Sequence, residues 1–470
     1  MLSPNHKTKI VATIGPASES PDMLERLILA GLNVARLNFS HGDFEGHASV
    51  ISRIRAASGA TGRRVAIMAD LPGPKMRLGK IEPGPILLAA GDLFTLTSEE
   101  VVGTSQRVSM SFEPLPRVVK PGDRLYLNDG LVQLLVERVE GMDVHCRVAV
   151  GGTLSSRKGL NLPRIPLGIS AFTAHDQKCL EFALEQGVDA ISQSFVESAA
   201  DMDAVRSAAA ALGKKPFLIA KIERLEALEN YEEILAVSDG IMVARGDLGV
   251  EVPIEEMAVT QKRLIARARM LAKPVITATQ MLESMTTSRL PTRAEATDVA
   301  NAILDGTDSV MLSGESAVGA FPEEAIRMLG KIAASAEKHR DTLIKGGDAS
   351  GCKASETLSA RSRLLEHAIA LTESDAVLVP TKSGHTARVA SRSRPPVWVI
   401  AVSEDPATLQ GLCFSSGVFP LEIDEDPDDW NLFARSLTPR LGFSCKKILL
   451  VAGPSQKNPH ANQRIEVIVL

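Results

Sequence analysis

The sequence predicts an α/β protein, a (β/α)8 TIM barrel with an inserted all-β barrel domain and a C-terminal α/β domain. Its 470 residues correspond to about three domains at roughly 150 residues each. Short β-branched runs alternate with helical stretches through most of the chain, and one long segment departs from that alternation. Aromatic residues make up only 4% of the chain, which favours an aliphatic α/β architecture over a β-sandwich.

Eight apolar runs are the expected barrel strands. They are nearly continuous rather than alternating, which is typical of strands buried on both faces. Strands that alternate with helices in this way close into a barrel whose active site lies at the carboxyl ends of the strands. The runs are Ile10–Ile14, Asn33–Phe39, Val65–Ala69, Ala190–Phe195, Phe217–Ile222, Gly240–Ala244, Pro274–Ala278 and Ser309–Leu312.

Local signals mark where several barrel helices begin. Thr173 precedes a helical run, and Ser198 is followed three residues later by Asp201, which is a capping pattern. Pro253 and Pro322 each open a helix, because proline is tolerated in a first turn.

Two segments interrupt or follow the barrel. Over residues 75–166 the helical pattern gives way to short strands separated by turns such as PGP, KPGD and NDG, which predicts the inserted β-barrel domain. Over 346–470 a helix near 361–372 and strands near 376–379, 397–402, 447–451 and 465–470 follow the polar segment GGDASGCKASE. The barrel is therefore expected over 1–74 and 167–345.

Composition and charge exclude several kinds of partner. With 52 Lys and Arg against 57 Asp and Glu, the net charge is −5, so no general attraction to nucleic acid or an anionic membrane is expected. No uncharged apolar run approaches the ~18 residues of a membrane span. The start MLSPNHKTKI lacks the apolar core of a signal peptide. Five widely spaced cysteines fit reduced thiols, so a cytoplasmic location is expected.

Charged side chains stand where two of the expected strands end. In IAKIE the strand period of two puts Lys221 and Glu223 on one face, and Asp247 follows the next strand. A buried lysine needs a partner, so one interpretation is an ion pair that only packs the barrel mouth. The other is that Lys221 faces an anion, while Glu223 and Asp247 hold a hard cation such as Mg²⁺.

Three further groups at the same end suit a phosphorylated substrate. Arg36 offers a guanidinium fork to phosphoryl oxygens, unless it only forms a salt bridge at the barrel rim. Gly246 leaves room for a ligand to approach the backbone at the start of a helix, and Thr279 supplies a small hydroxyl. Phosphoryl transfer needs charge neutralisation and in-line positioning more than a covalent nucleophile, so this set is typical of that chemistry.

At these residues the sequence resembles the pyruvate kinase family. The resemblance spans essentially the whole chain and is weakest in the inserted domain and at the extreme C-terminus. The matching segments, in the family's order, are TKIVATIGPAS from Thr8, GLNVARLNFSHG from Gly31, KIE at 221–223, SDGIMVARGDLGVE from Ser238, KPVITATQMLESM from Lys273, PTRAEATDVANAILDGTDSVMLSGE from Pro291 and TKSG from Thr381.

The resemblance implies phosphoryl transfer from phosphoenolpyruvate to ADP and protonation of the enolate to pyruvate. It implies Mg²⁺, with Mn²⁺ as a substitute, on Glu223 and Asp247, and a phosphoryl group held by Arg36 and Lys221. The bound Mg²⁺ would bridge phosphoenolpyruvate to the enzyme. The substrate carboxylate would lie against the Gly246 backbone and the Thr279 hydroxyl. Thr279, through a water near Ser313 and Glu315, is the expected proton donor.

The resemblance also implies how the nucleotide binds. Arg77 and Lys158 of the inserted domain would contact ADP, with Asn38 and His41 nearby. Closing the inserted domain over the barrel mouth would exclude water that could otherwise accept the phosphoryl group. Gly46 stands where relatives commonly have an aromatic residue near the base, so loose selectivity among nucleoside diphosphates is expected.

One departure from the family pattern concerns K⁺. Potassium-activated members bind K⁺ at the positions of Asn38, Ser40, Asp70 and Leu71, the last usually a threonine. Here Leu71 lacks the hydroxyl, and Lys75 in DLPGPK brings an ammonium close by. Because a tethered charge can replace a bound monovalent ion, K⁺-independent activity is expected, unless Lys75 only forms a surface salt bridge.

The C-terminal segment VLVPTKSGHTARVA predicts a strand, a turn and a helix, an arrangement that binds phosphate at a helix N-terminus but also occurs as an ordinary turn. In the family this loop holds a phosphate of a sugar-phosphate or nucleotide effector. The family also implies a homotetramer. The candidate effector residues are Thr381, Lys382, Ser383, Gly384 and Thr386.

Two other functions fit part of the pattern. A Mg²⁺-dependent barrel lyase or aldolase acting on phosphoenolpyruvate or pyruvate would also place an arginine and two carboxylates at a barrel mouth, but it would not need the inserted domain. A catalytically idle barrel that senses sugar phosphates would have no reason to keep Lys221, Glu223, Asp247 and Thr279.

Overall fold

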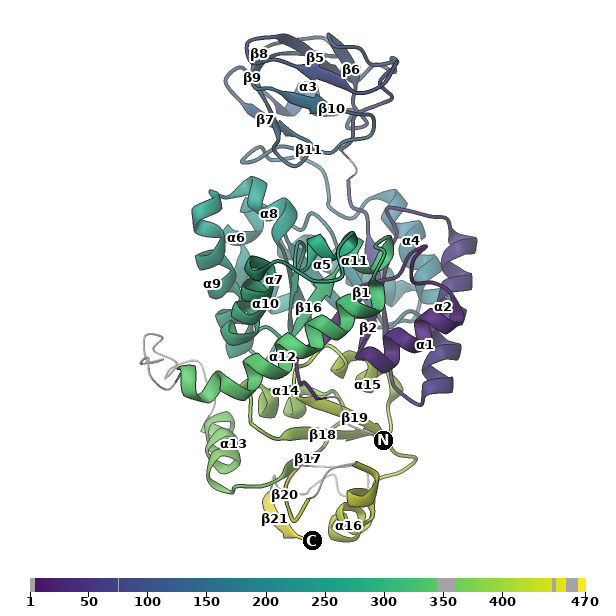
Figure 1. The fold of residues 1–470 in the computed structure, drawn as a ribbon, viewed down its shortest axis with the longest axis vertical. Helices are drawn as coiled ribbons and strands as arrows, with labels where there is room; N and C mark the ends of the chain where they lie inside the picture. The colour runs from purple at the N-terminus through teal and green to yellow at the C-terminus, as the bar shows by residue number, and fades with distance from the viewer. Residues whose placement is uncertain (1–4, 75, 345–359, 442–444, 454–463) are drawn as a thin grey trace.

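The computed structural model describes residues 5–74, 76–344, 360–441, 445–453 and 464–470. In Figure 1 an inserted β domain, a central barrel and a C-terminal domain follow one another along the long axis of the molecule. The polar segment GGDASGCKASE, Lys75 and most of the loop before the last strand lie outside the described residues.

The central domain is a closed barrel of parallel strands, as predicted, and neighbouring strands pair in chain order around it. Every expected run overlaps the strand that forms. The third strand runs to Leu71, two residues beyond the expected end, so Asp70 belongs to the strand. The strands are β1 (Lys9–Thr13), β2 (Val34–Asn38), β3 (Ala66–Leu71), β12 (Ala190–Gln193), β13 (Phe217–Ile222), β14 (Gly240–Ala244), β15 (Val275–Ala278) and β16 (Ser309–Leu312).

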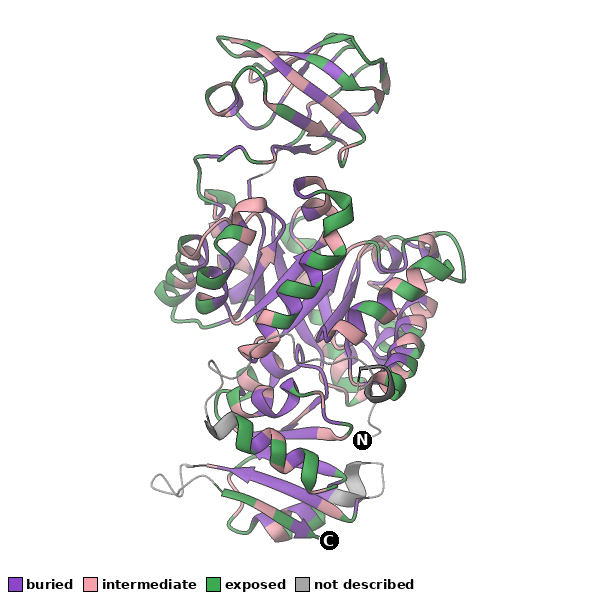
Figure 2. Ribbon diagram, turned by 90° about the vertical axis from the view of Figure 1, so that its left-hand side faces the viewer, coloured by how far each residue is buried: buried purple, intermediate pink, exposed green. Residues whose placement is uncertain are grey.

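Helices surround the barrel and bury its outer face, and Figure 2 shows the strands as buried between them. Thr173 and Ser198 form capping boxes at two helix starts, as expected. Pro322 begins a helix, whereas Pro253 is followed first by a short 3-10 turn (Ile254–Glu256). The helices are α1 (Pro21–Ala30), α2 (Phe44–Thr61), α4 (Ala174–Glu185), α5 (Ala199–Ala211), α6 (Leu225–Glu229), α7 (Tyr231–Val237), α8 (Arg245–Glu251), α9 (Met257–Met270), α10 (Arg293–Asp305), α11 (Gly314–Ala317) and α12 (Pro322–Ile344), with a second 3-10 turn at Glu283–Thr286.

The inserted domain is almost entirely β, with its own apolar core from Met76 to Leu167. Its strands pair as one six-stranded and one two-stranded sheet, so hydrogen bonding alone does not close them into the expected barrel. The packing of the two sheets around one core takes the place of continuous pairing. The elements are β4 (Ile86–Leu88), β5 (Leu93–Thr97), β6 (Arg107–Ser109), α3 (Leu115–Val118), β7 (Arg124–Leu127), β8 (Val132–Glu140), β9 (Asp143–Val150), β10 (Gly152–Leu154) and β11 (Leu160–Asn161).

The C-terminal domain is a five-stranded sheet with helices, as expected, and it lies at the amino ends of the barrel strands (Figure 1). The expected strands form, and Val418–Glu422 adds a strand that the sequence analysis missed. The domain docks through Phe414, whose ring stacks on Phe217 with centroids 5.3 Å apart. Its elements are α13 (Ala360–Leu371), β17 (Ala376–Pro380), α14 (His385–Arg392), β18 (Trp398–Ser403), α15 (Pro406–Leu412), β19 (Val418–Glu422), α16 (Trp430–Leu441), β20 (Lys447–Ala452) and β21 (Arg464–Val469). Among the residues described, no helix is long and apolar enough to cross a membrane.

Candidate active site

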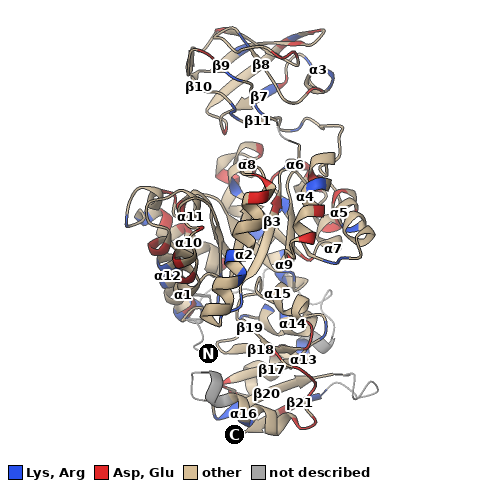
Figure 3. Cartoon of the chain, turned by 90° about the vertical axis from the view of Figure 1, so that its right-hand side faces the viewer, with Lys and Arg blue, Asp and Glu red and all other residues tan. Residues whose placement is uncertain are grey.

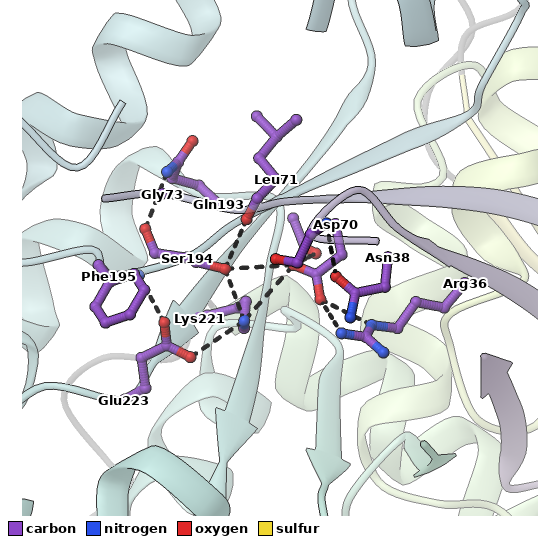
Figure 4. Close-up of polar contacts among 12 residues, drawn as sticks. Arg36, Asn38, Asp70, Leu71, Gly73, Gln193, Ser194, Phe195, Lys221 and Glu223 are labelled. Carbon is purple, nitrogen blue, oxygen red and sulfur yellow. Dashed lines mark hydrogen bonds and ion pairs between the residues drawn. The ribbon is translucent and has the colours of Figure 1, made fainter. Parts of the chain in front are cut away.

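Asp70 is the centre of a buried polar cluster at the carboxyl ends of the barrel strands (Figure 4). One of its carboxylate oxygens, Oδ2, accepts from Nε of Arg36 at 2.7 Å and from Nη2 at 2.5 Å. Nη1 of Arg36 donates to the Thr13 hydroxyl at 2.8 Å. The salt bridge considered as an alternative for Arg36 therefore forms. The salt bridge occupies two of the five guanidinium N–H groups and the bond to Thr13 a third, which leaves two for a ligand.

Lys221 lies beside both Asp70 and Glu223. Its Nζ is 3.6 Å from Oδ1 of Asp70 and 3.2 Å from Oε2 of Glu223, so the strand period does bring Lys221 and Glu223 together. Burial opposes the charge of Lys221, but Asp70 and Glu223 outweigh burial and raise its pKa. Burial likewise disfavours the charged form of Asp70, but the nearby charges of Lys221 and Arg36 outweigh burial and lower the pKa of Asp70. Both groups are therefore charged at neutral pH.

Two serines complete this cluster, and the sequence analysis missed both. Ser194 accepts a hydrogen bond from Nζ of Lys221 at 2.7 Å and donates to the Leu71 carbonyl at 2.7 Å. Ser192 donates to Oδ1 of Asp70 at 2.9 Å. A signal existed, because the two serines alternate within the apolar run Ala190–Phe195 and therefore point the same way.

Glu223 and Asp247 fit a site for a hard cation. Oε1 of Glu223 accepts from the Phe195 N–H at 2.7 Å, but buried Oε2 has no hydrogen-bond donor and only the nearby charge of Lys221. Burial raises the pKa of Glu223 to about 7; the nearby charge of Lys221 lowers this pKa, and that of Asp247 raises it further. Burial also raises the pKa of Asp247. Around this point two cations, Arg36 and Lys221, lie among the three carboxylates of Asp70, Glu223 and Asp247, so a bound cation would favour the ionised forms of Glu223 and Asp247.

The described residues contain no group of three or more His, Cys, Asp and Glu arranged to hold a metal. A site of two carboxylates completed by water and substrate oxygens suits Mg²⁺ rather than zinc. Figure 3 shows the acidic residues of α8 at the end of the barrel that faces the inserted domain.

Thr279 has an unusual backbone. Its φ is 69°, followed by 54° at Gln280, a left-handed conformation that costs a β-branched residue on the order of 1–3 kcal/mol. Arg245 holds this turn by donating to the carbonyls of Ala278 and Thr279. The Thr279 hydroxyl accepts from the Gly246 N–H at 2.7 Å and donates to the Ala278 carbonyl at 2.6 Å. The two groups expected to hold a substrate carboxylate are thus bonded to each other.

Glu315 is occupied by backbone partners. Its carboxylate accepts from Leu282 N–H at 3.1 Å and from Ser313 N–H at 2.8 Å, and the residue is fully buried. It therefore ties the ends of β15 and β16 together, and each of its oxygens accepts one backbone N–H.

The expected monovalent-ion residues lie together at the ends of β2 and β3. Asn38 pairs in register with Asp70, and its Oδ1 accepts from the Ser40 N–H at 3.1 Å. The Leu71 side chain, however, packs into the apolar core outside the barrel, while its carbonyl faces Ser194. A side chain at position 71 therefore points away from the cluster, so the missing threonine hydroxyl removes no ligand here. Lys75 lies outside the described residues.

Of the expected nucleotide residues, Asn38 lies beside Asp70 in the barrel cluster, whereas Arg77 and Lys158 lie apart from it. Arg77 and Lys158 lie in the inserted domain, side by side, because Leu78 N–H bonds to the Lys158 carbonyl at 2.9 Å and Arg77 bridges to Gly159. His41 follows β2, where its carbonyl contacts the His47 ring at 2.9 Å.

The expected effector residues form the turn between β17 and α14. The Thr381 hydroxyl accepts from the Gly384 N–H at 3.0 Å, and Gly384 has a φ of 74°. Nη2 of Arg388 donates to the Ser383 carbonyl at 2.8 Å. Lys382 and Ser383 are exposed, and Thr386 is half-buried in the first turn of α14.

A (β/α)8 barrel with paired buried carboxylates, a lysine and an arginine at the carboxyl ends of its strands defines a barrel enzyme that handles an anionic substrate beside a cation. Comparisons with known proteins narrow this class. The family model for the barrel domain of pyruvate kinase matches residues 5–326, and the model for its alpha/beta domain matches residues 362–463.

Known relatives agree over the length of the chain. A pyruvate kinase of Thermococcus litoralis is 47% identical over 91% of this chain and 90% of its own length. One from Clostridium acetobutylicum is 41% identical over 95% of each chain. The crystal structure of a pyruvate kinase from Cryptosporidium parvum matches with a TM-score of 0.89 at 34% identity, covering 99% of this chain and 96% of that one. The chain belongs to the pyruvate kinase family and is a phosphotransferase of glycolysis.

Proposed function

We propose that the chain transfers the phosphoryl group of phosphoenolpyruvate to ADP in a Mg²⁺-dependent reaction, giving pyruvate and ATP, and that Mn²⁺ can substitute. The observation that carries the proposal is the Glu223 oxygen that is buried without a donor, beside Asp247 and Lys221. Glu223 and Asp247 would hold the metal. When bound, the metal supplies positive charge to the oxygens of the substrate.

Arg36 and Lys221 bind the phosphoryl group in this proposal. Asp70 orients the guanidinium through two hydrogen bonds, so that its remaining N–H groups are preorganised for phosphoryl oxygens. Lys221 lies between Asp70 and Glu223 and stabilises the negative charge on the transferring group. Ser194 fixes the position of the lysine Nζ.

Thr279 and Gly246 hold the carboxylate end of the substrate. A substrate carboxylate would replace the hydrogen bond that these two residues now form with each other. A Cβ at Gly246 would lie 3.5 Å from Thr279, which is ordinary contact, so packing alone does not require glycine there. Thr279 also protonates the enolate, through a water near Ser313 and Glu315, and Glu315 in addition supports the neighbouring strand ends.

ADP binds between the barrel and the inserted domain, to Arg77 and Lys158 with Asn38 and His41 nearby. Arg77 and Lys158 lie on adjacent backbone segments of the inserted domain, which supports placing both near the nucleotide. The domain limits of 1–74 with 167–345, 75–166 and 346–470 belong to this proposal. The separate apolar core of the inserted segment supports them, although that core extends one residue further, to Leu167.

Four finer points complete the proposal. The reaction is K⁺-independent, with Lys75 in place of the ion near Asn38, Ser40 and Asp70. A phosphate of a sugar-phosphate or nucleotide effector binds the turn of Thr381, Lys382, Ser383, Gly384 and Thr386. The protein is a cytoplasmic homotetramer, and the buried free cysteines among the residues described support the reducing location. A panel of sugar phosphates and AMP tests the effector: a flat half-saturation for phosphoenolpyruvate removes it.

The deciding experiment measures pyruvate and ATP from phosphoenolpyruvate and ADP with Mg²⁺. We expect both products only with all three present, and a loss of about 100-fold or more in Glu223→Gln. Glu232→Gln, on the exposed end of α7, is the matched control and keeps full activity. Pyruvate that forms without ADP would mean that water accepts the phosphoryl group, and either that outcome or no product at all would refute the proposal.

A further inference from the structure

Arg224 is a buried charge that the proposed reaction does not use. It directly follows Glu223, and its side chain is only 2% exposed. A buried arginine is rare unless its N–H groups are satisfied, so its partners show what it holds.

Two of these partners belong to the segment that returns from the inserted domain to the barrel. Nη1 donates to the Leu162 carbonyl at 3.2 Å, and Nη2 donates to the Ile165 carbonyl at 3.1 Å. The side chains of Leu162 and Ile165 lie in the apolar core of the inserted domain. Arg224 therefore contacts backbone that is packed into that domain.

The other partners belong to the barrel. Nη1 is 3.2 Å from a carboxylate oxygen of Glu251, which is buried at the end of α8 and also accepts from the Leu225 N–H. Nη2 is 3.4 Å from Glu197 and 3.3 Å from Glu226. Glu223 directly follows β13, and α8 carries Asp247 as well as Glu251. The Arg224 guanidinium therefore joins the returning segment to the two elements that carry the proposed metal ligands.

Beside this contact, open space partly separates the inserted domain from the barrel. A cavity of about 680 Å³ separates residues 122–133 of the inserted domain from residues 249–254 of α8 and the turn after it. Figure 1 shows the inserted domain beyond the carboxyl ends of the barrel strands. The side chain of Asn161 bonds to Asp247, which makes a second tie in the same returning segment.

We propose that Arg224 is a positioning residue for phosphoryl transfer: it sets where the returning segment 161–165 lies relative to Glu223 and Asp247, and so where the inserted domain closes over the barrel mouth. This inference rests on the proposed function, since it assigns Arg77 and Lys158 of the inserted domain to ADP. Displacing the returning segment 161–165 would therefore weaken ADP binding and turnover, while the barrel residues that bind phosphoenolpyruvate stay in place.

The test compares Arg224→Gln and Arg224→Lys with the wild type. Hydrogen–deuterium exchange without substrates reads the returning segment directly, and steady-state kinetics separates ADP from phosphoenolpyruvate. We expect faster exchange at 160–166 in Arg224→Gln and a loss of about 10- to 100-fold in kcat/KM for ADP. Affinity for phosphoenolpyruvate, measured by calorimetry without ADP, stays within about twofold, because Arg36 and Lys221 are untouched. Arg224→Lys keeps the charge but not the fork, and restores part of the loss.

Arg394→Gln is the matched control. Arg394 is 5% exposed and likewise joins a carboxylate, Asp308, to a backbone carbonyl, that of Gly306, but at the opposite end of the barrel. Its loss should leave hydrogen–deuterium exchange at 160–166 and kcat/KM for ADP unchanged. If Arg224→Gln fails to fold, Arg224→Gln with Glu251→Gln removes both buried charges, and the same measurements apply.

The outcomes separate the two proposals. Unchanged exchange at 160–166, or an ADP defect no larger than that of Arg394→Gln, overturns the role of Arg224. A wild type that forms no ATP refutes the proposed function. The exchange measurement still reports whether Arg224 fixes the position of the returning segment 161–165.

Discussion

Arg36 and Asp70 face each other from neighbouring barrel strands, and two N–H groups of the arginine converge on a single carboxylate oxygen, at 2.7 Å and 2.5 Å. The other oxygen of Asp70 accepts a hydrogen bond from the Ser192 hydroxyl and lies 3.6 Å from Nζ of Lys221. One carboxylate thus orients both cations expected to bind the phosphoryl group. Its removal leaves both charges without their common partner.

Asp70→Asn is therefore expected to lower kcat/KM for phosphoenolpyruvate by about 10- to 100-fold while the barrel stays folded. The amide keeps the shape of the side chain but loses its charge and offers one acceptor oxygen in place of two. Steady-state kinetics with circular dichroism checks this. Ser192→Ala, which removes one hydrogen bond to the same carboxylate, should cost much less. Equal effects of the two variants would contradict the role assigned to Asp70.

The strained turn at Thr279 carries the second prediction. Thr279→Val keeps the shape of the side chain but removes the hydroxyl that now bonds to Gly246 and that is proposed to protonate the enolate. We expect turnover to fall by about 100-fold or more, and Thr279→Ser to keep most of it. Full turnover in Thr279→Val, measured by pyruvate release, would exclude the threonine as proton donor.

Local patterns predict the barrel well. Its strands are continuous apolar runs, and Thr173 and Ser198 cap their helices through residues three positions away, so a few neighbouring residues suffice. Lys221 and Glu223 are similar, because strand geometry alone puts both on one face.

Other features depend on partners distant in sequence. The Arg36–Asp70 pair needs two strands to be neighbours, and the sequence suggests a rim salt bridge for Arg36 without identifying its partner. The orientation of Leu71 depends on where the third strand ends, and that end was placed two residues too early. Arg224 is the clearest case, because its partners come from the inserted domain and from α8.

Potassium independence is the third prediction. At fixed ionic strength, replacing a large organic cation by K⁺ should leave the wild-type rate unchanged. Lys75→Ala removes the tethered charge and should lower the rate, and K⁺ should restore part of it. Leu71→Thr is a useful control, because this side chain points into the core outside the barrel and should not create K⁺ activation. Several-fold activation of the wild type by K⁺ would refute the prediction.

Lys9, at the junction of the barrel and the C-terminal domain, gives a prediction for pH. Its Nζ donates to the Val418 carbonyl at 2.7 Å and lies 5.6 Å from the centre of the Trp398 ring. Burial lowers the pKa of Lys9 from 10.5 to about 8, despite opposing contributions from Cys413, Glu337 and Asp308. Between these two values the unfolded chain binds a proton that the folded protein has lost, so raising the pH favours folding.

The wild type should therefore gain stability relative to Lys9→Met as the pH rises from about 8 to about 10.5. Methionine keeps most of the apolar length but cannot titrate in this range, so the difference between the two proteins isolates Lys9 from other groups that ionise in alkali. The midpoint of urea unfolding, followed by circular dichroism at several pH values, measures the difference. Lys331→Met, at an exposed position on α12, controls for the methionine itself. If the difference in unfolding midpoint between wild type and Lys9→Met stays constant across this pH window, folding does not lower the pKa of Lys9.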